Sequence, residues 1–109
     1  MPERSEQETA YFALLRAREE LSGLLRYAEH LDDEVRRIRR TEREEAALRT
    51  GVAPQMRRIL RASDEELTEV LARRAALVED ERARLPARIE AAEAFVAECE
   101  RHLDVLRGG

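Results

Sequence analysis

Apolar residues recur along the first part of the chain at alternating spacings of three and four. Such spacing is typical of the a and d positions of a coiled coil, where one narrow side of a helix packs against a partner helix. The pattern ends at Glu42 and Glu45, shortly before Gly51 and Pro54, which are typical helix-ending residues. We therefore predict a helix over about 6–49. Its seam residues are Leu14, Ala17, Leu21, Leu24, Ala28, Leu31, Val35 and Ile38.

A second stretch with the same spacing predicts another helix, over about 63–107. Both helix starts have the spacing of a capping box, Ser5 with Glu8 and Ser63 with Glu66. In such a box two side chains satisfy backbone amides that would otherwise lack partners. The clearest seam residues of the second helix are Leu85, Ile89, Ala92, Val96, Cys99, Leu103 and Leu106.

Two helices of similar length, joined by a basic connection over about 50–62, predict a long antiparallel hairpin, coiled-coil-like and all-α, as a single domain over 1–109. Folding at the connection places Leu14 near Cys99. Pro86 removes a backbone hydrogen bond from the second helix, and we expect a kink there, because no turn-forming residue adjoins it to start a third helix. The pattern leaves open whether the seam pairs within one chain or between two chains.

The composition supports one narrow seam and excludes a thick globular core. Only 4% of the 109 residues are aromatic, and 40% are charged. Several large apolar residues nevertheless lie beside the seam, where a hairpin alone does not cover them, so we expect a homodimer in a four-helix arrangement. These lateral apolar residues are Tyr11, Phe12, Leu15, Leu25, Leu77, Phe95 and Val105.

The net charge of −4 conceals a basic middle segment. Residues 36–61 hold nine arginines against three glutamates, whereas the segments on either side are both acidic. In a hairpin these arginines gather at the tip, where they form either an anion-binding surface or an ordinary solvated one. The candidate partner-binding residues are Arg36, Arg39, Arg40, Arg43, Arg57, Arg58 and Arg61.

Part of the same segment, residues 46–61, resembles a helix-turn-helix. It has a small residue four positions before Gly51, an apolar residue after it, and arginines on the following helix, which this resemblance would place in a major groove of DNA. The segment departs from the motif at Arg57, where an apolar residue is expected, and it lacks a compact third helix.

The sequence gives little support for catalysis or for metal binding. Neither His30 nor His102 has a glutamate three positions before it, as di-iron bundles require. Cys99 and His102 would bind a metal only across a dimer, and a seam cysteine is more simply a small apolar residue. We expect no enzyme activity, cofactor, metal or small-molecule substrate. Because no apolar run spans a membrane or resembles a secretion signal, we expect a cytoplasmic location and no membrane partner.

The sequence therefore predicts a non-enzymatic coiled-coil adaptor, assembly or regulatory protein. It would bind a protein or nucleic acid through its arginine-rich tip or through its lateral apolar residues. The alternative is a dimeric DNA-binding transcriptional regulator that uses residues 46–61.

Overall fold

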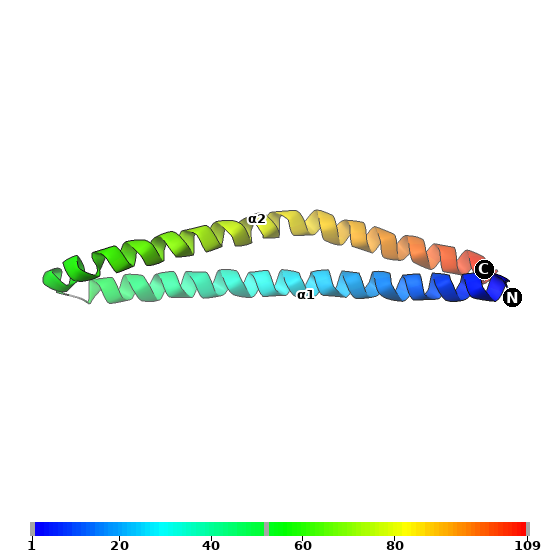
Figure 1. Ribbon diagram of the computed structural model, residues 1–109, viewed down its shortest axis with the longest axis horizontal. Helices are drawn as coiled ribbons and strands as arrows, with labels where there is room; N and C mark the ends of the chain where they lie inside the picture. The colour runs from blue at the N-terminus through cyan, green and yellow to red at the C-terminus, as the bar shows by residue number, and fades with distance from the viewer. Residues whose placement is uncertain (1, 52, 109) are drawn as a thin grey trace. The chain divides into compact units, whose positions relative to one another are not determined.

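The computed structural model describes residues 2–51 and 53–108, leaving aside the side chains of residues 2–4, 57, 59, 60, 62 and 63. It contains two helices, α1 over Pro2–Thr50 and α2 over Pro54–Leu106 (Figure 1). No strand occurs among the described residues. The two helices pack against each other, which confirms the predicted all-α helical hairpin.

The connection between the helices is much shorter than the predicted 50–62. The Ala53 carbonyl accepts a hydrogen bond of 3.0 Å from the Met56 amide, which opens the first turn of α2 directly after Pro54. Proline suits a first helical position, because its fixed φ is already helical and its missing N–H would have no partner there. Ser63 therefore lies inside α2 and does not start it, and its side chain is outside the described residues.

α1 also begins earlier than predicted, at Pro2, so Ser5 lies inside the helix. The Ser5 carbonyl accepts a hydrogen bond from the Thr9 hydroxyl at 2.9 Å. At the far end of the chain, Gly108 has a φ of +80° and donates its amide to the Val105 carbonyl at 3.1 Å. Glycine adopts this left-handed conformation without steric cost, so it ends α2 cleanly.

α2 continues through Pro86, as predicted, and no third helix begins there. Pro86 is exposed, so its ring displaces no core side chain. The helix tolerates the loss of one backbone hydrogen bond because the residues around Pro86 remain packed against α1, including Leu85, which is buried.

The chain divides into two compact units. Unit 1 consists of Met1–Ala28 with Arg84–Gly109, and unit 2 consists of Glu29–Ala83.

Unit 1 has an apolar core between the first part of α1 and the last part of α2. Leu14 and Cys99 belong to the same packed cluster, as the predicted register requires. The Gln7 side-chain amide donates a hydrogen bond of 2.9 Å to the Leu106 carbonyl. Gln7 lies seven residues before Leu14, and Leu106 lies seven residues after Cys99, so the same register continues toward the ends of the chain. The buried residues of the cluster are Ala10, Leu14, Ala17, Val96 and Leu103.

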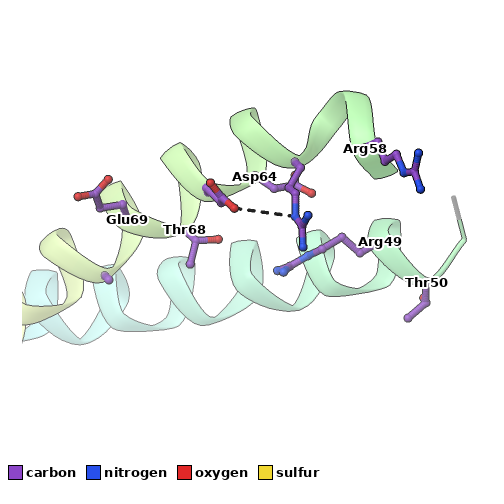
Figure 2. A pocket seen from close by; sticks show the side chains of 9 residues that line it. Arg49, Thr50, Arg58, Asp64, Thr68 and Glu69 are labelled. Carbon is purple, nitrogen blue, oxygen red and sulfur yellow. Dashed lines mark ion pairs between the residues drawn. The ribbon is translucent and has the colours of Figure 1, made fainter. Parts of the chain in front are cut away.

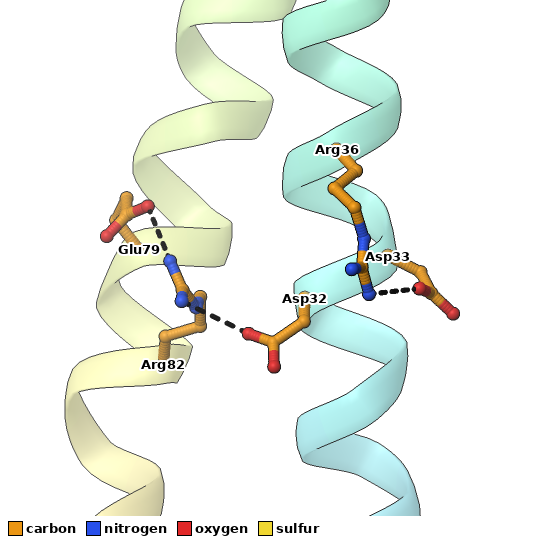
Figure 3. A network of polar contacts seen from close by, with 5 residues as sticks. All are labelled: Asp32, Asp33, Arg36, Glu79 and Arg82. Atoms are coloured by element: carbon orange, nitrogen blue, oxygen red, sulfur yellow. Dashed lines mark hydrogen bonds and ion pairs between the residues drawn. The ribbon is translucent and has the colours of Figure 1, made fainter.

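Unit 2 has a seam that is partly ionic. Leu31, Ile38 and Val78 are buried as the spacing predicts, but Glu34 is buried where Val35 was expected, and Val35 is only half-buried. A further ion pair crosses from α2 to α1 beside this seam, where Arg82 Nη2 lies 3.1 Å from Asp32 Oδ1 (Figure 3). Paired charges therefore replace part of the apolar packing in this unit.

Candidate functional site

Four of the predicted partner-binding arginines lie on α1 in unit 2, and we call them the arginine row. Arg36 Nη2 contacts Asp33 Oδ1 at 2.7 Å (Figure 3). Arg40 and Arg43 are exposed and make no ion pair within the described part of the chain. Both guanidinium groups are therefore available to a partner. The row consists of Arg36, Arg39, Arg40 and Arg43.

Arg39 differs from the rest of the row because it borders a small groove between the helices. Glu42 and Glu79 border the same groove, so carboxylates from both helices lie near this guanidinium.

The end of the hairpin holds an open groove of about 920 Å³, which we call the tip groove (Figure 2). Its charged lining is mixed, with three arginines and three carboxylates. Arg61 Nε lies 4.0 Å from Glu65 Oε1, and both side chains are largely exposed. Arg57, which sequence analysis grouped with these arginines, has its side chain outside the described residues. The lining residues are Arg49, Thr50, Arg58, Arg61, Asp64, Glu65, Thr68, Glu69 and Ala72.

The fold therefore changes the charge of the predicted tip. Residues 36–61 are basic as a segment, but Asp64, Glu65 and Glu69, further along α2, line the same groove as Arg49 and Thr50 at the end of α1. Unit 2 as a whole contains twelve arginines and fourteen acidic residues. Within unit 2, Arg40, Arg43, Arg49 and Arg58 are exposed and make no ion pair among the described residues.

The segment over residues 46–61, which resembles a helix-turn-helix in sequence, consists of the end of α1, a short connection and the start of α2. In that motif two short helices cross at a steep angle. Here α1 and α2 run antiparallel along each other within unit 2, since Glu34 contacts Arg74 at 2.9 Å and Asp32 contacts Arg82 at 3.1 Å. These contacts lie outside residues 46–61, and DNA binding by this segment stays a prediction.

All seven lateral apolar residues are exposed, as their positions beside the seam predict. In unit 1, Phe12 is 61% exposed and Val105 is 70% exposed. The rings of Tyr11 and Phe12 contact each other edge to face at 5.8 Å, which leaves the rest of both rings accessible.

The lateral residues of unit 1 divide between two sides of the seam. Tyr11 lies seven residues before Arg18 and Leu25 lies seven residues after it, so all three side chains are on the same side of α1. Arg18 Nη2 is 3.4 Å from Glu100 Oε1 of α2, so this is also the side of that ion pair. Phe95 and Val105 are each five residues from Glu100, which corresponds to about 140° around a helix. Their rotations from Glu100 run in opposite senses, so the two residues are about 80° apart, and both point away from the side of this ion pair. Unit 1 offers two separate apolar surfaces.

Three more large apolar side chains of unit 2 are exposed, and sequence analysis did not single them out. They are Leu48, Met56 and Val70. The signal was present for two of them, because Met56 and Val70 share a heptad position with Leu77, which was recognised. Met56 lies before residue 63, where α2 was expected to begin, whereas Val70 lies inside the predicted helix and its spacing from Leu77 could have identified it.

The residues considered for metal binding are not brought together. His30 and His102 are both exposed, and Cys99 is half-buried within the apolar cluster of unit 1. Among the described residues, no three histidine, cysteine or acidic side chains are grouped so as to hold a metal ion. Neither helix, over the residues described, is long and apolar enough to cross a membrane.

Comparison with protein-family models, with curated proteins and with solved structures finds no match to this chain.

Proposed function

We propose that this chain is a non-enzymatic adaptor, assembly or regulatory protein that acts by binding other macromolecules along the sides of its helices. One observation carries the proposal. Large apolar side chains that the seam does not use are exposed in both units, among them Phe12, Phe95 and Leu77. Leaving such surface in water costs free energy, and covering it with a partner recovers that cost.

The first partner that we propose is a second copy of the chain, in a four-helix arrangement. The lateral apolar residues on two sides of unit 1 support this proposal. The seam is already used by the contact between α1 and α2, so a second hairpin can bind only to apolar surface outside the seam. We place the dimer contact among the lateral apolar residues.

Size-exclusion chromatography with light scattering tests this proposal. One variant carries Tyr11→Ser with Leu25→Ser, and another carries Phe95→Ser with Val105→Ser, so that each changes one side of unit 1. The expected result is a dimeric wild-type protein and weaker self-association in at least one variant, with unchanged helical circular dichroism. A wild-type monomer would remove self-association from the proposal.

A second binding surface is the arginine row, and the free guanidinium groups of Arg40 and Arg43 favour it. An acidic protein surface and a nucleic acid are the two candidate partners, and the latter corresponds to a DNA-binding regulator. Phosphate contacts release counterions, so binding to duplex DNA should weaken steeply as salt is raised.

Titration of labelled duplex DNA at several salt concentrations separates these partners. If DNA is the partner, Arg40→Ala with Arg43→Ala reduces the salt dependence, and the matched change Arg26→Ala with Arg101→Ala in unit 1 does not. Absence of binding at low salt would exclude DNA and leave an acidic protein surface. In either case, unchanged partner affinity in Arg57→Ala, Arg58→Ala and Arg61→Ala together would exclude the end of the hairpin from the binding surface.

A further inference from the structure

Three of the lateral apolar residues of unit 1 lie along one line of α1. Tyr11, Leu15 and Leu25 fall on positions that alternate by three and four residues, which is the spacing of a coiled-coil contact. All the residues on these positions are exposed. We call them the α1 line, which consists of Glu8, Tyr11, Leu15, Arg18, Ser22 and Leu25.

α2 carries a second line of the same kind in unit 1. Phe95 and Val105 are separated by ten residues, as Leu15 and Leu25 are. The positions between and before them follow the same order of spacings as the α1 line, and all are again exposed. We call these residues the α2 line, which consists of Arg88, Ala91, Phe95, Glu98, His102 and Val105.

Both lines lie beside the seam and not in it. Leu15 directly follows the buried Leu14, and Phe95 directly precedes the buried Val96. Successive residues are about 100° apart around a helix, so each line is turned away from the partner helix of its own hairpin. A single hairpin therefore leaves both lines uncovered.

The two lines match position by position when they are laid side by side in parallel. Because their spacings are the same, each residue of the α1 line has one counterpart, 80 positions further along the sequence, on the α2 line. Half of these layers are apolar on both sides, and one of them sets a large side chain against a small one, as close packing favours. The apolar layers are Tyr11 with Ala91, Leu15 with Phe95, and Leu25 with Val105.

The remaining layers are polar on both sides. Two of them bring opposite charges together, and the third brings a hydroxyl group to an imidazole, which are able to share a hydrogen bond. No layer sets like charges against each other or a charge against an apolar side chain. The polar layers are Glu8 with Arg88, Arg18 with Glu98, and Ser22 with His102.

We propose that the α1 line of one copy of this chain binds the α2 line of a second copy, with the two helices parallel and in this register. Pairing each line with itself is less favourable. In parallel it would set Arg18 against Arg18 and Glu98 against Glu98, and like charges across a helix contact are destabilising.

Antiparallel pairing of a line with itself matches fewer layers. With Tyr11 opposite Leu15, Leu25 has no counterpart in the α1 line. With Phe95 opposite Val105, Ala91 has no counterpart in the α2 line. The pairing of unlike lines uses all six layers, so charge and apolar contact both favour it.

This contact joins two different surfaces, so each copy in a dimer keeps one line uncovered. Further copies are therefore able to add, and the assembly grows as a ring or an open chain. The dimer of the proposed function is its first step. This inference rests on the proposed self-association and identifies the two surfaces that meet.

Mixing two variants tests whether unlike lines pair. Tyr11→Ser with Leu25→Ser disables the α1 line, and Phe95→Ser with Val105→Ser disables the α2 line. Each variant alone is expected to be monomeric by light scattering where the wild-type protein associates, with unchanged helical circular dichroism. An equimolar mixture retains one intact line of each kind. It is expected to form a species with the mass of two chains and none larger.

The same samples separate this inference from self-association in general. If either variant alone associated as tightly as the wild-type protein, or if the mixture stayed monomeric, the pairing of unlike lines would be wrong although the wild-type protein associates. A monomeric wild-type protein would overturn both proposals.

Charge exchange tests the register. Arg88→Glu is expected to weaken self-association about fivefold, because the new carboxylate faces Glu8 of the other copy. Adding Glu8→Arg to the same chain restores opposite charges, and affinity returns toward the wild-type value. Arg101→Glu is the matched control, since Arg101 is exposed on α2 outside the α2 line, and affinity should not change. Equal weakening in the control, or no recovery in the double variant, would contradict this register.

Discussion

Glu34 is a buried carboxylate within the seam of unit 2, with 8% of its surface exposed. Arg37 of α1 lies 3.2 Å from Oε1, and Arg74 of α2 lies 2.9 Å from Oε2, so each carboxylate oxygen has a guanidinium partner. A buried charge is tolerated only when it is paired in this way. The Arg74 contact also joins the two helices at one particular register.

The seam pattern predicts Val35 in this position, because apolar residues outweigh neighbouring acids in such a pattern. The partner that makes Glu34 acceptable is Arg74, which lies far along the chain on the other helix. Periodicity within one helix contains no information about that partner. A buried ion pair between helices is therefore recognised only once the helices are placed together.

Arg74→Ala should lower the free energy of unfolding by about 2 kcal/mol, because Glu34 would keep Arg37 alone as its partner. Arg73→Ala is the matched control, since its pair with Glu69 is exposed and 3.8 Å long, and the expected loss is about 0.5 kcal/mol or less. Urea unfolding followed by circular dichroism measures both. Equal losses would show that Glu34 does not depend on Arg74.

Gly23 is a helix-interior glycine that has no structural requirement. An added Cβ would meet no atom within 4 Å, and the backbone is helical. Gly23→Ala should therefore raise the free energy of unfolding by about 1 kcal/mol through reduced backbone freedom of the unfolded chain. A lower thermal midpoint in calorimetry would indicate a contact that the fold does not show.

At the scale of elements, the two long helices are predictable because their seams repeat over many turns. Leu14, Ala17, Val96 and Leu103 are buried where the spacing places them. The start of α2 was less predictable, because Ser63 with Glu66 has the spacing of a helix N-terminal capping box, and Pro54 is a residue that often interrupts a helix. Proline at a first helical position carries no signature that distinguishes it from proline in a turn, so the local sequence favoured the wrong boundary.

Adjacent leucines of α1 offer a direct test of the seam. Leu14 is 4% exposed and Leu15 is 40% exposed. Leu14→Ala should cost about 3 kcal/mol of stability, because it leaves a cavity in the core of unit 1, whereas Leu15→Ala should cost less than about 1 kcal/mol in a dilute sample. Urea unfolding compares the two, and the seam assignment fails if Leu15→Ala is the more destabilising change.

Pro86 is the second element-scale test. Its exposed position inside α2 means that alanine would restore a backbone hydrogen bond without creating a clash. Pro86→Ala should raise the free energy of unfolding by up to about 3 kcal/mol. The thermal midpoint measures the change. A loss of stability would indicate that the proline conformation is itself required by the packing of unit 1.

At the scale of the whole molecule, the sequence predicted where charge lies along the chain but not how the fold would oppose it. At the tip groove, Arg49 of α1 and two arginines of α2 lie together with three carboxylates of α2, so the predicted cationic tip is in fact mixed. The exposed apolar side chains were better predicted, because any residue beside a coiled-coil seam remains uncovered when only two helices pair. Their exposure is the main support for a protein that functions by association.

Sedimentation equilibrium of the wild-type protein over a range of concentrations, with helicity measured on the same samples, tests this account most directly. The account predicts a fully helical species whose mass reaches twice that of one chain by tens of micromolar. A helical monomer that persists at those concentrations would contradict it, because the exposed apolar sides of both units would then have no second copy to cover them.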